Sequence, residues 1–104
     1  MYKFIKTQQR PSDSTLFFFE RYPPPTDYTD YITKNYIETK KIIGYQKIVS
    51  LNKMKVTIIM TWQSRLDFLS YLTDEYVFNV NEKANDYDID NNILTTVEIA
   101  KDNE

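Results

Sequence analysis

The chain has 104 residues, of which 41% are hydrophobic and 15% aromatic, and its formal net charge is -2. This composition suits one small globular domain, residues 1–104, and argues against disorder. The sequence contains neither Cys nor His, which excludes disulfides, thiol nucleophiles, Cys-based metal sites and the common catalytic triads. General base catalysis would therefore fall to Asp, Glu, Lys or Tyr.

Charge is unevenly distributed along the chain. Residues 1–62 contain ten Lys or Arg and five Asp or Glu, a balance of +5, whereas residues 63–104 contain three and ten, a balance of -7. Such a split can bring two halves of a fold, or two copies of a dimer, together as readily as it attracts a ligand. The plainer interpretation is that the two regions form solvated surfaces that happen to differ in charge. The N-terminal sequence has no apolar run suited to a signal peptide or a membrane span, so we expect a cytoplasmic protein.

The N-terminal region predicts a strand followed by a bend. Residues Tyr2 to Thr7 alternate as a strand does, with Phe4 and Lys6 in phase on one face. A turn-prone cluster, Pro11 to Ser14, follows this strand. The apolar run Leu16 to Phe19 then predicts extended chain, which either continues the first strand after the bend or pairs with it as a hairpin.

Three consecutive prolines separate this region from a predicted helix. Pro23 to Pro25 cannot donate hydrogen bonds to a sheet and favour the polyproline conformation. We interpret them as a stiff connector, with a recognition motif as the alternative. Thr26 or Asp27 then caps a helix that we expect to continue to about Lys41, because its tyrosines and Ile32 lie along one side.

Two strands follow as a predicted antiparallel hairpin. Ile42 to Val49 is the first of them, and it contains Gly44, where we expect a bulge or a close approach of another backbone. A short turn, Ser50 to Lys53, leads into the second. Every second residue of this next stretch is apolar: Met54, Val56, Ile58, Met60 and Trp62. This period of two indicates a strand with one apolar face.

The apolar period changes to that of a helix after Trp62. Ser64 stands three residues before Asp67, which is typical of an N-cap, and apolar residues then recur at helical spacing as far as Leu72. We expect a polar, acidic loop over Glu82 to Asn92. A last strand over Ile93 to Ile99 and a charged tail complete the chain in residues 93–104.

The predicted order of elements is strand, helix, strand, strand, helix, strand. This is the split βαβ, or ferredoxin-like, α+β arrangement, in which both helices cover one face of an antiparallel sheet. The opposite face carries Thr57, Ile59 and Thr61, which are too apolar for a clearly solvated surface and too polar for an ordinary core. Because symmetric dimers are the commonest oligomers, we expect a homodimer with this face as its interface, which would make a dimeric α+β barrel.

The strand-to-helix junction resembles a known family. Trp62, Gln63 and Ser64 form an aromatic-x-Ser junction like that of dimeric α+β barrel proteins of the antibiotic biosynthesis monooxygenase type. The resemblance covers Tyr28 to Leu72, and the order of elements over most of the chain. It implies a pocket between sheet and helices, and in the cofactor-independent members an oxygenase activity on aromatic or polyketide substrates. Haem-degrading members usually rely on a His ligand, which this chain lacks, so we predict no cofactor.

The resemblance suggests a substrate-binding site near Trp62. Trp62 would stack on a planar substrate, while Tyr28, Tyr31 or Arg65 orient its polar groups. The alternative is structural, with Trp62 filling the core where the strand meets the helix and the tyrosine rings packed with their hydroxyls at the surface. Ser64 is better explained as an N-cap than as a nucleophile, because no base is available to activate it.

Two other kinds of binding can be weighed from the sequence. Asp86, Asp88 and Asp90 alternate as in the first half of a calcium loop, but Asn91 and Val97 stand where that loop needs Gly and Glu. A solvated acidic loop is the better interpretation. The element order also suits an RNA-recognition fold, yet the strand before the junction lacks the basic and aromatic signature of such domains. We therefore predict no metal, no nucleic acid and no membrane among the partners.

Two functions remain open from the sequence. The first is a cofactor-independent, monooxygenase-like enzyme that acts on a planar organic substrate. The second is a non-catalytic binding or assembly protein that uses the sheet face. The excess of Lys over Arg, ten to three, suggests an AT-rich genome such as that of a phage or of certain bacteria. An enclosed pocket lined by polar as well as aromatic groups would favour the enzyme, and a filled core would favour the binding protein.

Overall fold

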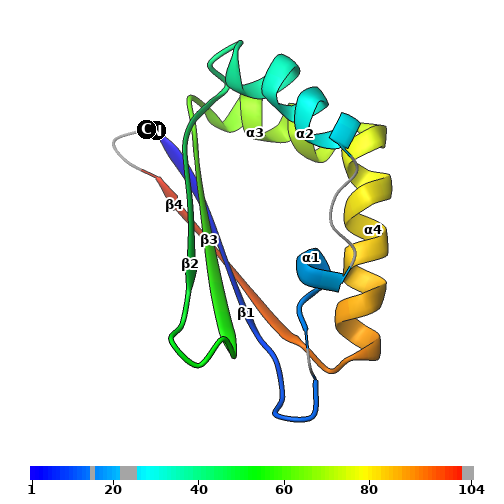
Figure 1. Cartoon of the computed structure of the whole chain (residues 1–104). Coiled ribbons are helices and arrows are strands. Elements are labelled where there is room, and N and C mark those ends of the chain that lie inside the picture. Colours follow the sequence, from blue (N-terminus) through cyan, green and yellow to red (C-terminus); the bar gives the residue numbers. More distant parts are fainter. Residues whose placement is uncertain (15, 22–25, 102–104) are drawn as a thin grey trace.

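A computed structural model describes residues 1–14, 16–21 and 26–101, and it places an antiparallel sheet beside a layer of helices (Figure 1). The sheet has four strands in the order β2-β3-β1-β4. Their bounds are β1 Tyr2–Gln9, β2 Ile42–Val49, β3 Lys55–Trp62 and β4 Leu94–Lys101. Helical segments join β1 to β2 and β3 to β4, so the predicted ferredoxin-like α+β fold is confirmed.

The helices lie on one face of the sheet (Figure 1). Their bounds are α1 Phe18–Arg21, α2 Thr26–Ile32, α3 Arg65–Leu72 and α4 Glu75–Asp90, and α2 continues as a π-helical turn, η1, over Thr33–Ile37. The predicted helix to about Lys41 therefore ends earlier, at Ile37, and Lys40 takes a left-handed backbone with φ of 61° in the turn that follows. None of the helices in the described ranges is long and apolar enough to cross a membrane. The predicted connector Pro23 to Pro25 lies outside the described residues.

The register of the sheet puts the alternating apolar residues of β3 under the helices. Trp62 pairs with Tyr2 on one side and Ile42 on the other, and all of them are buried. The pairing of β2 with β3 shifts between Ile42 and Gly44, which is the predicted bulge. A Cβ atom at Gly44 would lie 3.3 Å from Thr61 Cβ, so a close approach also explains this glycine.

The predicted N-cap at the strand-to-helix junction is confirmed. The Ser64 hydroxyl accepts a hydrogen bond from Asp67 N at 3.2 Å, and Ser64 has the extended backbone of a cap residue. One otherwise unsatisfied donor at the helix start is thereby satisfied. The junction from β3 to α3 thus forms as its local sequence predicts.

The predicted acidic loop over Glu82 to Asn92 is wrong, because most of this segment is the second half of α4. The residues of α4 that face inward recur at helical spacing: Val77, Val80, Asn81, Ala84, Tyr87 and Asp88. Two of these inward-facing residues, Asn81 and Asp88, are polar, so the sequence does not show the continuous apolar face of an amphipathic helix. Asp86 and Asp90 are exposed while Asp88 is buried, and the described residues contain no cluster of three or more side chains suited to a metal.

The predicted extended run Leu16 to Phe19 is also wrong, since it leads into the short helix α1. Phe17 N donates to Glu20 Oε2 at 2.9 Å, and Glu20 N donates to Phe17 O at 3.0 Å, which closes a helical turn. Tyr87 of α4 donates its hydroxyl hydrogen bond to Leu16 O at 2.6 Å. Burial of Phe17 against α4 therefore overrides the local preference for a strand.

The core of the molecule is divided into two clusters. The Trp62 cluster consists of Tyr2, Tyr36, Ile42, Met60, Trp62, Phe68 and Val77. The Phe17 cluster consists of Phe17, Val56, Tyr87 and Ile93. Since Val56 and Trp62 lie near opposite ends of β3, the two clusters fill opposite ends of the space between sheet and helices. Ile58, which lies between these ends, packs against both.

Candidate functional site

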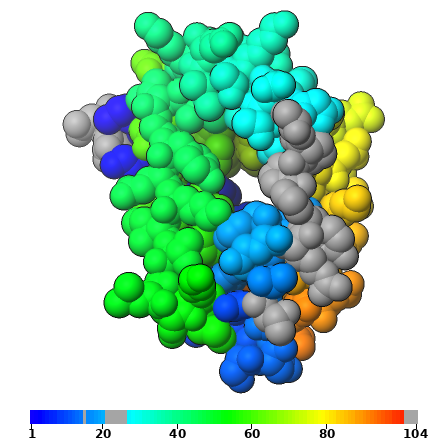
Figure 2. Space-filling model, viewed as in Figure 1, coloured from blue at the N-terminus to red at the C-terminus, as the bar shows by residue number. Residues whose placement is uncertain are grey.

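A cavity of about 580 Å³ lies between the sheet and the helices, where the two core clusters leave the middle of the fold unfilled. Its walls are contributed by the middle of β1 and β3 through Phe4, Ile58 and Met60, and by the helices opposite. Figure 2 shows the molecule hollowed between β2 and α2. Protein interiors rarely leave space larger than a water molecule, and this volume falls in the range of small-molecule sites.

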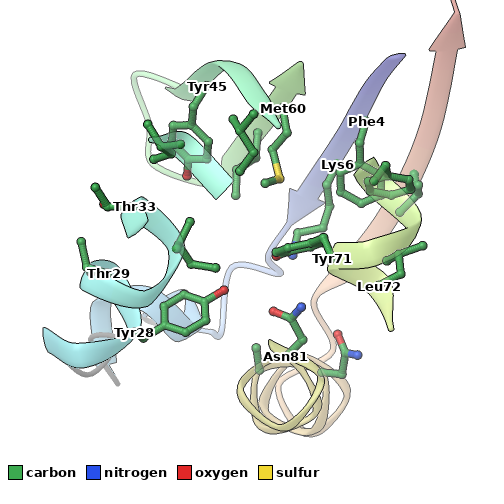
Figure 3. Close-up of a pocket in the computed structure, with 18 of the residues that line it drawn as sticks. Phe4, Lys6, Tyr28, Thr29, Thr33, Tyr45, Met60, Tyr71, Leu72 and Asn81 are labelled. Carbon is green, nitrogen blue, oxygen red and sulfur yellow. The ribbon is translucent and has the colours of Figure 1, made fainter. Parts of the chain in front are cut away.

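Polar side chains from several elements reach this largely apolar cavity. Lys6 comes from β1, Tyr28 from α2, Tyr71 from α3, and Asn81 and Asn85 from α4. In Figure 3 the side chains of Lys6, Tyr28 and Asn81 point into the space between the sheet and the helices. A few polar groups that converge on an apolar cavity are typical of sites that orient a small molecule.

Tyr28 remains a hydrogen-bond donor across the neutral pH range. Burial raises the pKa of its hydroxyl above the ordinary value, and a hydrogen bond with the neighbouring Tyr71 hydroxyl raises it further. Both effects favour the neutral phenol. The Tyr28 and Tyr71 hydroxyls therefore form a polar pair on the helix side of the cavity.

Three polar residues, Lys6 and Gln8 of β1 and Asp88 of α4, come together between the sheet and the helices. Gln8 Nε2 donates to Asp88 Oδ2 at 2.6 Å, and Asp88 is only 5% exposed. Burial raises the pKa of Asp88, while the hydrogen bond from Gln8 and the charge of Lys6 oppose that rise. Burial likewise lowers the pKa of Lys6, and the Asp88 charge opposes this. Lys6 and Asp88 thus support each other's charged state in a poorly solvated place.

Asp74 joins three helical segments above the cavity. Its Oδ2 accepts hydrogen bonds from the hydroxyls of Tyr31 at 2.5 Å and Tyr36 at 2.6 Å. Its Oδ1 accepts from the backbone of Tyr76 at 3.0 Å and of Val77 at 3.4 Å, which caps α4. Burial alone would raise the pKa of Asp74. The hydrogen bonds together lower the pKa by more than burial raises it, so the pKa lies below the ordinary value. This carboxylate fixes α2 and η1 to the start of α4.

The four substrate-binding residues predicted from the sequence fall in different places. Tyr28 lines the cavity. Trp62 is fully buried, 5.1 Å from the ring of Tyr71 between centroids, and so lies behind a lining residue. Neither Tyr31 nor Arg65 is among the lining residues. The Tyr31 hydroxyl donates a hydrogen bond to Asp74, and Arg65 is exposed at the start of α3.

Sequence reasoning did not single out Lys6, Asp74 or Asn81. The sequence does indicate that Lys6 points inward, because a lysine in phase with Phe4 falls on the apolar face of β1. Asp74 also precedes a helix start in the manner of a cap. Nothing in the sequence indicates Asn81, because the helix α4 was not predicted as far as this residue and only α4 turns its side chain toward the cavity.

No protein-family model and no curated protein matches the sequence. Solved structures do match. A protein from Deinococcus radiodurans, provisionally described as an antibiotic biosynthesis monooxygenase, is 13% identical with a TM-score of 0.64, over 100% of this chain and 94% of that one. A second antibiotic biosynthesis monooxygenase is 10% identical, with a TM-score of 0.64 over 100% of both chains.

A third solved structure is described as a dimeric ferredoxin-like protein from an uncultured marine organism. It is 11% identical, with a TM-score of 0.60 over 99% of this chain and 95% of that one. Identities this low relate the proteins by fold and not by activity. The chain has the ferredoxin-like fold found in antibiotic biosynthesis monooxygenase-like proteins.

Proposed function

We propose that the protein is a small cofactor-independent oxygenase that binds a planar organic substrate in the cavity between its sheet and helices. The observation that carries this proposal is the cavity itself, which leaves the core of a 104-residue chain divided in two. A chain this small gains stability by filling its core, so an open centre indicates a binding function. Two proteins of the same fold described as antibiotic biosynthesis monooxygenases agree with it.

The lining suits an aromatic substrate with oxygen substituents. Phe4, Phe68 and Tyr71 supply ring surfaces, and aromatic rings pack favourably against other rings in stacked or edge-on geometry. Tyr28 would orient a substrate oxygen by donating a hydrogen bond. Trp62 would act from behind, by holding Tyr71 through ring contact.

The reaction class follows from the chemistry of such substrates. An anthrone, as an example, has an acidic ring CH₂ group whose deprotonated form donates electrons to O₂. One oxygen atom enters that carbon to form the quinone carbonyl, and the other leaves as water with both hydrogens. The substrate supplies all the electrons, so the protein has to bind, orient and exclude water.

We expect the purified protein to accelerate O₂ uptake by anthrone above the uncatalysed rate, with anthraquinone as the product in chromatography. Ala84→Phe should reduce the acceleration, because Ala84 lines the cavity and a phenyl ring there would occupy part of the space that the substrate needs. Asp86→Phe, on the exposed side of the same helix, should retain it. Tyr28→Phe should lower kcat/KM by about tenfold, the value of one hydrogen bond near 1.4 kcal/mol.

The same assay separates the enzyme from a non-catalytic binding protein. Binding of anthrone or anthraquinone, seen as quenching of Tyr and Trp fluorescence, without faster O₂ uptake would contradict the oxygenase and favour the binding function. Equal activity of Ala84→Phe and the parent protein would contradict the cavity as the site.

We further propose that the sheet face away from the helices forms a homodimer interface. Thr57, Ile59 and Thr61 are half-buried there, and Ile5 pairs with Ile59 on the same face. Ile48 lies beside Thr57 and is 47% exposed. A threonine-bordered apolar centre of this kind suits burial against a second copy.

Sedimentation velocity at micromolar concentration should show a dimer. Ile59→Lys should shift it to a monomer, because each copy would bury an ammonium group in the interface without an anionic partner. Ile89→Lys, a substitution on α4 at a residue that is 73% exposed, should leave the dimer intact. A monomeric parent protein, or a dimeric Ile59→Lys, would show that this face is not the interface.

A further inference from the structure

Lys6 is the only charged residue among the described residues that line the cavity. The other polar groups there are hydroxyls and amides, so the lining as a whole carries positive charge. Lys6 lies in the middle of β1, where it pairs with Ile58 of β3 and Val97 of β4. A charged side chain in the centre of a largely apolar sheet face needs a partner or a function.

A buried polar pair, Gln8 and Asp88, lies near Lys6. Asp88 is the carboxylate whose charge acts on Lys6. Its Oδ2, however, accepts the hydrogen bond from Gln8, whose amide also donates to Thr95 Oγ1 at 3.2 Å. Asp88 and Gln8 are therefore hydrogen-bonded to each other and do not line the cavity. The Lys6 side chain does line it, and Figure 3 shows it extending into the space between sheet and helices.

We propose, on the basis of the binding site assigned above, that the cavity selects aromatic ligands carrying one anionic oxygen group, a carboxylate or phenolate, which lies against the Lys6 ammonium. A neutral ligand would leave the ammonium with only the charge of Asp88, whose Oδ2 already accepts from Gln8, whereas an anion in the cavity would give it a charge-assisted hydrogen bond of its own. The Tyr28 and Asn81 side chains can donate further hydrogen bonds to the same oxygens, since phenols and amides both carry donors.

The geometry also limits the ligand to one anionic group. Apart from Lys6, the described lining consists of apolar residues such as Ile32, Ile37 and Leu72 together with neutral hydroxyls and amides. A second anion placed there would be desolvated without a cationic partner, which is strongly unfavourable. The ligand that fits is therefore an aromatic body with a single acidic end.

Naphthalene-2-carboxylate and naphthalene-2-carboxamide test this inference, because they have the same shape and differ in charge. Isothermal titration calorimetry should give a Kd about tenfold lower for the carboxylate with the parent protein. Lys6→Met should remove this preference and leave the amide affinity within about twofold. Lys6→Arg should restore the preference, and Lys83→Met, at an exposed lysine of α4, should not change it.

Two results would overturn the inference, and only the second of them would also overturn the proposed function. Equal affinity of the parent protein for both compounds would disprove charge selection and leave the cavity as a site for neutral planar molecules. Binding of neither compound would disprove the proposed function as well. The comparison within the parent protein decides the matter even if Lys6→Met fails to fold, and circular dichroism of each variant shows whether it has folded.

Discussion

Trp62→Ala should lower the free energy of unfolding by about 3 to 5 kcal/mol, the cost of removing a large aromatic side chain from a core. Trp62 is 0% exposed. Its ring lies 5.5 Å from Phe68 and 5.9 Å from Tyr36, in edge-on geometry in both cases, so the truncation leaves a cavity where sheet and helices meet. In a domain of this size each kcal/mol lowers the Tm by roughly 4 to 8 °C. Urea denaturation followed by circular dichroism measures the loss.

Trp62→Phe provides the matched control. Trp62 Nε1 is buried and has no hydrogen-bond partner within the described part of the chain. Phenylalanine keeps most of the ring contact and removes this unsatisfied donor, so we expect a loss of only about 1 to 2 kcal/mol. A Trp62→Ala loss below about 1 kcal/mol would contradict the assignment of Trp62 to the core. A Trp62→Phe variant of normal stability with weakened naphthalene binding would instead show that Trp62 contacts the ligand.

Asp74→Ala should lower the free energy of unfolding by about 2 to 4 kcal/mol, because one carboxylate both caps α4 and accepts two tyrosine hydroxyls. The loss of the cap frees two backbone donors, and the loss of Oδ2 leaves Tyr31 and Tyr36 without this acceptor. Asp74 is only half-buried, so water takes over part of each interaction and limits the cost. Chemical denaturation at neutral pH gives the value.

Comparison with Ser64→Ala separates the helix-capping contribution of Asp74 from the contribution of its tyrosine hydrogen bonds. It removes a helix cap without any tyrosine partner, since the Ser64 hydroxyl accepts only from the backbone of its own helix among the described contacts. We expect a loss of about 1 kcal/mol. If Asp74→Ala costs no more than Ser64→Ala, the tyrosine hydrogen bonds contribute nothing to stability.

The effect of Asp74 should also depend on pH. The folded protein holds the pKa of Asp74 below its ordinary value, so folding favours the ionised form. This contribution is complete above about pH 4, the ordinary pKa of Asp, and it is lost as the pH falls through the lower folded-state pKa. The difference in stability between the parent protein and Asp74→Ala should therefore shrink in acid. A constant difference down to the acid unfolding transition would contradict this.

The sequence predicted the parts of the fold that local rules govern. The alternation that ends at Trp62, the cap at Ser64 and the bulge at Gly44 each involve neighbours in the chain or a direct strand partner. It predicted the wrong structure where distant contacts compete with local preference. The Leu16 to Phe19 run became helical because Phe17 packs against Tyr87, about seventy positions along the chain in the same cluster.

For the candidate site, the sequence alone determined the chemistry that is available: no Cys or His, abundant tyrosine, and a lysine in phase with the apolar face of β1. Only the tertiary structure decided where these groups meet. Tyr28 and Lys6 reach one cavity because α2 and β1 face each other across it, while Trp62 is buried behind Tyr71. Residue spacing fixes which side of an element a side chain takes, but the space between two elements depends on how all of them pack together.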